Sequence, residues 1–217
     1  MQSCLPGDTR MVRPSLMQLH SDRAVVTEIK QLMLPEEAQY LRDKAALVGF
    51  EESTVVAESG SSEKDSRRSS STSFLPKSED AVIDCIGQRI ATIAGQPLTH
   101  MEPMQVTDYK NKQEYRAHHD YFGKKGEPER TMTVFAYLHS VQCDTGECGG
   151  ATAFHELKDA KGQHLRVYPT PGNAVMWSNR TMTGELNPNT LHSGEKLMCA
   201  DAHKVGLNAW FRDTKWG

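Results

Sequence analysis

The sequence has no long apolar segment, no recognisable signal peptide and no strong excess of charge of either sign. No apolar run approaches the roughly 20 residues that cross a bilayer, so we expect no membrane association. Residues 1–20 mix prolines and charges with scattered apolar residues, unlike the continuous apolar region of a secretory signal. We therefore expect a cytoplasmic protein. The net charge of -3 at pH 7 indicates neither nucleic acid nor an anionic membrane as a partner.

Cysteine is scarce and odd in number. The five residues are Cys4, Cys85, Cys143, Cys148 and Cys199. Such a set does not indicate a disulfide framework and agrees with a reducing compartment, so we expect Cys85 to be a small core residue. Cys143 and Cys148 could be free thiols in a loop, one disulfide or, with His139 and His155, a structural zinc site. We favour the thiols or the disulfide, because their spacing is only loosely that of zinc ligands.

The first half of the chain predicts two helices and two strands. Residues 1–22 show no hydrophobic period, and we expect a flexible arm there. Apolar residues at helical spacing predict amphipathic helices over 35–48 and 80–94. Each helix is followed by glycine, which commonly ends a helix. Stretches 24–34 and 50–57 are rich in β-branched residues and favour strands.

Residues 58–73 are polar and rich in serine. Such a composition cannot build a core, so we expect an exposed loop. The simpler interpretation is a solvated linker. The alternative is a mobile lid that closes over a substrate.

The second half of the chain predicts short strands separated by turns. The candidates are 104–109, 115–121, 131–139, 151–154, 164–168, 173–177, 190–192 and 204–212. Eight short strands after two helices favour an α+β, mainly β fold, with a double-stranded β-helix (a cupin-like jelly roll) backed by helices. A chain of 217 residues fits one domain. We expect that domain over 23–217, with helical support and the serine-rich loop over 23–100 and the jelly roll over 101–217.

A possible metal site lies in the predicted strand 115–121. Residues i and i+2 project from the same face of a strand, so His118 and Asp120 can reach one point while His119 points away. His192 is a third possible ligand far downstream. Two imidazoles and one carboxylate make the facial triad of non-haem Fe(II) oxygenases, which leaves metal positions open for a cosubstrate and O₂.

A buried cation is predicted at the start of the last strand. Lys204 is followed by a largely apolar segment, and an unpaired buried ammonium is costly. An oxoacid that chelates the metal would carry a far carboxylate able to pair with this lysine. Tyr109 and Thr152 could donate hydroxyl hydrogen bonds to the same carboxylate.

Several ordered motifs carry a resemblance to a known family. They are Tyr109, Tyr115–Phe122, Arg130–Thr133, Tyr137–Leu138, Gly149–Phe154, Gly172–Val175, Leu191–Gly194, Lys204 and Asn208–Arg212, with a weaker echo in Arg68–Leu75. A His-x-Asp pair alone is a weak signal, but these motifs in this order are a strong one. From about residue 104 to 212, the chain resembles the prolyl 4-hydroxylase family of Fe(II)/2-oxoglutarate dioxygenases, in its compact algal, viral and protist forms.

The resemblance implies a specific chemistry. The enzyme would hydroxylate prolyl residues of a peptide or protein, consuming O₂ and 2-oxoglutarate and releasing succinate and CO₂; ascorbate is a candidate additional cofactor. The implied Fe(II) ligands are His118, Asp120 and His192, and the implied 2-oxoglutarate ligands are Tyr109, Thr152 and Lys204. The triad and Lys204 together would be the catalytic residues.

The substrate groove implied by the resemblance contains Tyr115, Arg130 and Trp210, with Arg212 at a more variable position. Aromatic and arginine side chains there suit a proline-rich peptide, which is already extended. Two rivals stay open: the same site acting on another side chain or a free amino acid, and a non-catalytic sensor or binding module. The assembly state, monomer or homodimer, is open as well.

Two departures from the family pattern stand out. The interval from His192 to Lys204 is about two residues longer than usual, which requires a bulge or a longer turn over 196–203. His155 and Glu156 replace the usual proline after the Gly-Gly-x-Thr motif.

Overall fold

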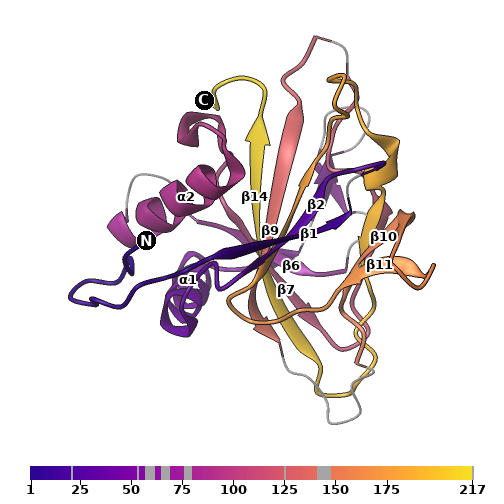
Figure 1. The fold of residues 1–217 in the computed structure, drawn as a ribbon. Coiled ribbons are helices and arrows are strands. Elements are labelled where there is room, and N and C mark those ends of the chain that lie inside the picture. The colour runs from indigo at the N-terminus through magenta and orange to yellow at the C-terminus, as the bar shows by residue number, and fades with distance from the viewer. Residues whose placement is uncertain are drawn as a thin grey trace.

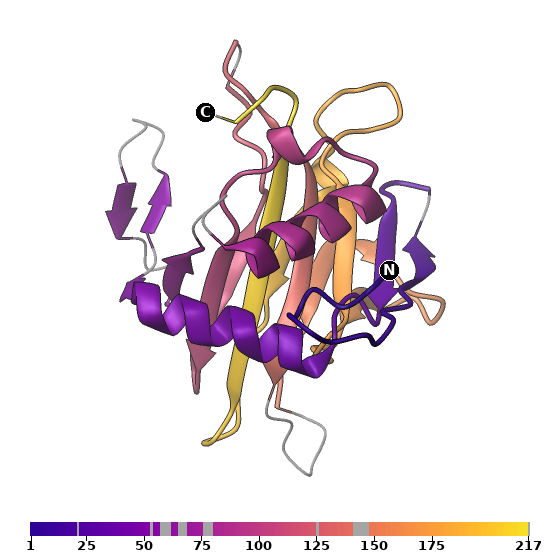
Figure 2. The same ribbon diagram turned by 90° about the vertical axis from the view of Figure 1, so that its left-hand side faces the viewer.

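Two facing sheets and two helices make up the fold in the computed structural model. The structure describes residues 1–20, 22–52, 54–56, 62–64, 69–75, 80–124, 126–140 and 148–216. Both helices lie on one side of the larger sheet, and β10 and β11 of the smaller sheet lie on its other side (Figure 1). Turning the molecule shows α1 and α2 running across the strands that they cover (Figure 2).

The larger sheet holds eight strands. In spatial order they are β1 (Ser15–His20), β2 (Val26–Lys30), β12 (Ala174–Ser178), β9 (Arg130–Ser140), β14 (His203–Arg212), β7 (Gln105–Lys110), β6 (Ser71–Phe74) and β3 (Glu51–Glu52). All neighbouring pairs are antiparallel.

The smaller sheet faces the larger one and holds four strands. They are β11 (His164–Val167), β10 (Thr152–Lys158), β13 (His192–Gly194) and β8 (Tyr115–His118), again antiparallel throughout. A separate hairpin joins β4 (Thr54–Val56) and β5 (Ser62–Lys64). Short 3₁₀ turns, η1 (Leu98–His100) and η2 (Pro188–Thr190), precede β7 and β13.

Both helices begin and end where their sequences provide caps. In α1 (Pro35–Val48), the Glu37 side chain accepts a hydrogen bond from the backbone N–H of Leu34, which satisfies a donor at the helix start. In α2 (Ala81–Ala94), Asp80 accepts hydrogen bonds from two first-turn amides. Gly95 then ends α2 at a φ of 64°, a conformation that glycine adopts without strain. In the part of the chain that the structure describes, no helix is both long enough and apolar enough to span a bilayer.

Two apolar cores hold these layers together. The first fills the space between the helices and the larger sheet, and it includes Ile86 and Ile90 of α2, both buried. The second lies between the two sheets, where the ring of Phe154 meets that of Trp177 edge-on at 5.3 Å. The second core fills only part of the space between the two sheets, and polar side chains line a cavity in the rest.

The predicted jelly roll with supporting helices is confirmed, while one element boundary is corrected. Both helices and all eight second-half strands are present near their predicted positions. However, β8 ends at His118, so Asp120 lies in the turn after the strand and not on it. The division at residue 22 and the single domain over 23–217 stay predictions. Residues 58–61 and 65–68 of the serine-rich stretch 58–73 lie outside the described residues. The expectation of an exposed loop is wrong for its end, because residues 71–73 belong to β6 of the larger sheet, where Thr72 and Ser73 are buried.

The expectation of no disulfide framework is wrong. Cys4 is bonded to Cys85, and Cys148 is bonded to Cys199. The partners are 81 and 51 residues apart, so only the tertiary fold brings them together. Cys85 is therefore not a free core thiol, and Cys148 is not available for the zinc site considered above. Cys143 lies outside the described residues.

The segment expected as an arm is attached to the fold in two places. Residues 15–20 form β1, which pairs with β2 at the edge of the larger sheet. Nearer the terminus, Gln2 and Met11 form an antiparallel bridge, and the loop that they close packs on the helices. Sequence periodicity could not detect this attachment, because it depends on the Cys4–Cys85 disulfide, the β1–β2 pairing and polar contacts that only the tertiary fold brings together.

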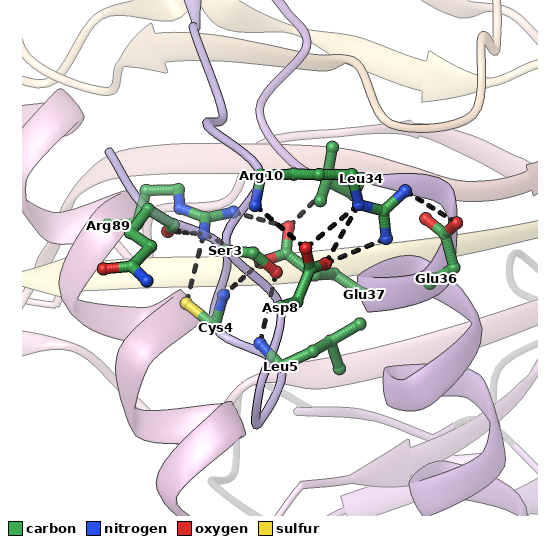
Figure 3. Close-up of polar contacts among 10 residues, drawn as sticks. Ser3, Cys4, Leu5, Asp8, Arg10, Leu34, Glu36, Glu37 and Arg89 are labelled. Carbon is green, nitrogen blue, oxygen red and sulfur yellow. Dashed lines mark hydrogen bonds and ion pairs between the residues drawn. The ribbon is translucent and has the colours of Figure 1, made fainter.

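A buried ion pair fastens this loop (Figure 3). Glu37 and Arg89 lie 2.7 Å apart, with side chains 0% and 2% exposed. Glu37 also accepts a hydrogen bond from the backbone N–H of Cys4, and Arg89 donates one to the carbonyl of Gln2. Burial alone would raise the pKa of Glu37, but the bonds from Arg89 and the two amides hold it below its usual value. The carboxylate thus stays charged inside the protein.

We expect Glu37→Gln to lower the free energy of unfolding by about 3–5 kcal/mol, because Arg89 would remain buried without its anion. Glu36→Gln is the matched control. Glu36 precedes Glu37 in α1 and pairs with Arg10 at 2.9 Å, but about half of each of these side chains is exposed, and such pairs contribute little. Urea unfolding followed by circular dichroism measures both variants. Equal losses in the two would contradict a special role for the buried pair.

Candidate active site

Three potential metal ligands meet between the two sheets. His118 is the last residue of β8 and His192 the first of β13, and the antiparallel register places them directly opposite each other. Asp120 reaches the same point from the turn after β8. One ligand atom from each residue lies within 4.8 Å of the other two, the single such group among the described residues. The sequence prediction that these three residues converge therefore agrees with the geometry.

Backbone carbonyls orient both imidazoles. His118 Nδ1 lies 2.8 Å from the carbonyl of Arg116, and His192 Nδ1 lies 2.9 Å from that of Thr190. A carbonyl can only accept, so Nδ1 carries the proton and Nε2 keeps a free lone pair, as a metal ligand requires. Burial, with a smaller contribution from His118, lowers the pKa of His192 to about 4. This ring is therefore neutral at physiological pH.

The Asp120 carboxyl is buried but ionised. It is 7% exposed, and burial alone would raise its pKa. Interactions with His192, His118 and Arg130 instead hold the pKa far below the usual value. The carboxylate oxygens lie 3.6 Å from His118 Nε2 and 3.8 Å from His192 Nε2, so the carboxylate faces the Nε2 atoms of both imidazoles.

An isolated ammonium lies deeper in the same cavity. Lys204, the second residue of β14, is 1% exposed, and its Nζ donates to the carbonyl of Gly150 at 2.8 Å. Burial lowers its pKa to about 8. None of the ion pairs found among the described residues involves this lysine. The cavity walls thus contain a buried cation as well as the three ligands.

The cavity brings together most of the predicted site residues. Its walls contain Tyr109, Tyr115, His118, Asp120, Phe135, Thr152, Trp177, His192, Ser193, Gly194, Lys204, Asn208 and Trp210. The ring of Tyr109 lies 4.8 Å from the Lys204 ammonium. The hydroxyl of Thr152 lies 2.9 Å from that of Tyr137, which is fixed in turn by the carbonyl of Val167. Sequence analysis did not single out Phe135 or Trp177, because apolar residues on strands are common, and it assigned no role to Asn208, which it named only as part of a family motif.

Arg130 and Arg212 do not line the cavity itself. Both guanidinium groups pair with the buried carboxylate of Glu102, at 2.7 and 2.8 Å. Arg130 also lies 3.7 Å over the ring of Trp210, which does line the cavity. Sequence analysis missed Glu102. It lies in irregular structure between η1 and β7, where no motif or period marks it.

A second disulfide secures the turn before Lys204. Cys148 is bonded to Cys199, and the Cys148 carbonyl accepts a hydrogen bond from the N–H of Met198. The next residues, Gly149 and Gly150, have φ values of 72° and 79°, which favour glycine. The turn thus absorbs the longer interval from His192 to Lys204, and Gly150 still reaches the ammonium.

Comparisons with known proteins agree with this geometry. Residues 104–212 match the family model of the 2OG-Fe(II) oxygenase superfamily. "Probable prolyl 4-hydroxylase 10" of Arabidopsis thaliana is 34% identical over 199 residues, which cover 83% of this chain and 64% of the relative. "Prolyl 4-hydroxylase 1" of the same organism is 31% identical over 218 residues, covering 93% and 72%. This chain thus spans about two thirds of the length of such relatives.

Solved structures share the fold. The viral collagen prolyl hydroxylase of Paramecium Bursaria Chlorella virus-1, in its 2OG complex, has a TM-score of 0.68 and 21% identity, over 87% of this chain and 96% of that one. A Trichoplax adhaerens prolyl hydroxylase in complex with a hypoxia inducible factor peptide has a TM-score of 0.62 and 14% identity, over 87% and 83%. The family expected from the motifs is thereby confirmed, and the chain belongs to the 2OG-Fe(II) oxygenase superfamily.

Proposed function

We propose that the protein is an Fe(II)- and 2-oxoglutarate-dependent prolyl 4-hydroxylase that acts on a peptide or protein. The observation that carries this proposal is the convergence of His118, Asp120 and His192 in one cavity with the unpaired ammonium of Lys204. The curated relatives are prolyl 4-hydroxylases by name, which supports the substrate class. Fe(II) and 2-oxoglutarate, when bound, supply the oxidising power for inserting an oxygen atom from O₂ into a C–H bond, with release of succinate and CO₂.

The donor set fits Fe(II). Two imidazole nitrogens and one carboxylate oxygen are the ligands that non-haem iron oxygenases use. His118 and His192 present Nε2 because carbonyls hold their Nδ1 protons, and Asp120 remains ionised despite burial. Neither the Asp120 carboxylate nor the neutral His192 imidazole requires proton loss near neutral pH before it binds the ion.

The lysine end of the cavity fits the far carboxylate of 2-oxoglutarate. Lys204 is buried and has no carboxylate partner in the part of the chain that the structure describes, and a bound carboxylate would remove the cost of that charge. The hydroxyls of Tyr109 and Thr152 lie in the same walls and can donate to it. Phe135 lines the cavity beside them and excludes water from the ion pair.

The mouth of the cavity fits an extended peptide. Tyr115 stacks on His118, with ring centroids 3.6 Å apart, and Trp210 carries Arg130 on its face. With Arg212, these residues offer aromatic surfaces and fixed cations beside the proposed metal. Proline-rich segments dock on such surfaces at low entropic cost, because they are already extended.

The cysteine pairing supports a revised location. Two disulfides are typical of proteins in oxidising compartments and rare in the cytosol. We therefore infer an oxidising compartment in place of the cytoplasmic location expected from the sequence.

The central test measures succinate release from 2-oxoglutarate with a proline-rich peptide and with a matched peptide in which alanine replaces proline. We expect only the first to stimulate release and to gain one oxygen by mass spectrometry. Stimulation by a free amino acid or another side chain would favour the wider oxygenase reading. Release that no peptide changes would contradict the prolyl assignment.

Asp120→Ala should abolish hydroxylation and weaken binding of a divalent metal, because it removes the only anionic ligand. Equilibrium titration of the metal-free protein with Co²⁺, followed by visible absorption, measures the binding directly. Asp43→Ala, which removes an exposed carboxylate on α1, is the control and should bind Co²⁺ as the parent does. Parent-like titration of Asp120→Ala would refute the ligand assignment.

Lys204→Met should raise the KM for 2-oxoglutarate roughly 10- to 100-fold, as expected for losing a hydrogen bond to a charged group. The parent should also show a KM that rises above about pH 8, where Lys204 loses its proton. Below that pH the ammonium is present and the KM should be flat. The variant, which has no proton to lose there, should lack this rise. Lys110→Met, at an exposed position, controls for the loss of a surface charge. If Lys204→Met kept the rise in KM above about pH 8, that rise would belong to a group other than Lys204.

A further inference from the structure

Two consecutive hydrogen bonds, from Asn179 to Thr133 and from Thr133 to Asp120, form a short chain that ends at the Asp120 carboxylate. The hydroxyl of Thr133 donates to Asp120 Oδ2 at 2.7 Å. The side-chain amide of Asn179 donates to the same hydroxyl at 3.1 Å. Thr133 lies on β9, Asn179 directly follows β12, and Asp120 follows β8, so three separate segments contribute. Thr133 and Asn179 are 0% exposed.

Chemistry fixes the direction of this chain. An ionised carboxylate has no proton to donate, so the single proton of the Thr133 hydroxyl must point to Asp120. The hydroxyl oxygen is then an acceptor for the Asn179 amide. Asn179 Oδ1 consequently has no hydrogen-bond partner although it is buried, an arrangement that costs free energy.

The backbone holds Asn179 in place despite this cost. Its N–H donates to the carbonyl of Thr131, and its own carbonyl accepts from the N–H of Asn187, both at 2.9 Å. Thr133 is fixed as well, because it lies opposite Trp177 in the β9–β12 pair. The hydroxyl thus meets Asp120 from a rigid position, as support for a preorganised site requires.

Thr133 contacts only one of the two carboxylate oxygens. Oδ2 accepts from Thr133 and lies 3.8 Å from His192 Nε2, whereas Oδ1 lies 3.6 Å from His118 Nε2. We propose that Thr133, oriented by Asn179, is a positioning residue that fixes the orientation of the Asp120 carboxylate between the two imidazoles. A carboxylate free to rotate would present its oxygens to the metal in varying positions and bind it less tightly. This inference rests on the proposed function of the triad.

The pair Thr133→Val and Thr133→Ser tests the hydroxyl itself. Valine has nearly the shape of threonine but no donor, while serine keeps the donor and loses only a methyl group. Partners behind metal ligands typically change metal affinity 10- to 100-fold. In Co²⁺ titrations of the metal-free protein, we expect at least about a 10-fold loss of affinity for valine and near-parent affinity for serine.

Further measurements separate positioning from folding. Thermal unfolding without metal reports the stability of each variant, and a merely structural role would lower the melting temperature without changing the Co²⁺ affinity of the folded protein. If Thr133→Val does not fold, Asn179→Ala, which leaves the Thr133 donor in place but no longer oriented, should weaken Co²⁺ binding to a smaller extent. In a double variant that combines Thr133→Val with Asn179→Ala, the two losses of Co²⁺ affinity should not add, because both substitutions act through the Thr133 hydroxyl.

The outcomes distinguish this inference from the proposed function. If the parent binds Co²⁺ no more tightly than Asp120→Ala, the metal site itself is wrong. If the parent binds more tightly than Asp120→Ala and Thr133→Val matches the parent, the metal site stands and the positioning role is overturned. Equal losses in the valine and serine variants would also overturn it, since the hydroxyl would then not be the group that matters.

Discussion

The register between β8 and β13 is the constraint on which the site depends. His118 and His192 are directly opposite each other in that antiparallel pair. A slip of one residue would turn one imidazole to the other face of the sheet. On its other edge, β13 pairs with β10, where Gly194 lies opposite Thr152. The same short strand therefore fixes both the proposed metal ligands and one wall of the proposed 2-oxoglutarate pocket.

Buried charge is handled in two different ways in this molecule. Glu37 and Arg89 satisfy each other and the backbone around them, so their charges serve the architecture. Among the described residues, the Lys204 ammonium has one hydrogen bond, to the carbonyl of Gly150, and no ion pair, and burial lowers its pKa. A fold that keeps such a group gains from any anion that binds there, which links cosubstrate binding to stability.

Local chemistry in the sequence accounts for the parts that could be predicted. Pro35, Asp80 and Gly95 mark helix ends through backbone capping, and alternating apolar residues mark the strands, so elements and their order follow from the sequence. The triad stood out through its His-x-Asp spacing and the ordered family motifs, and Lys204 because it begins a largely apolar strand. Glu102 gave no such signal and Thr133 was only one residue of a motif, since their roles depend on partners that only tertiary packing brings near.

The pairing of the cysteines also depends on tertiary packing and therefore could not be predicted from the sequence. An odd, sparse set of cysteines argues against a disulfide framework when only the sequence is known. Cys148 and Cys199 meet because an antiparallel bridge joins residues close to them in the chain, Gly149 and Leu197. Their bond ties the longer turn before Lys204 to the segment that supplies Gly150. A longer connection would ordinarily loosen the placement of a side chain at its end. Here the disulfide joins Cys199, five residues before Lys204, to Cys148, two residues before Gly150. It thereby holds the ammonium next to the Gly150 carbonyl, despite the longer interval between His192 and Lys204.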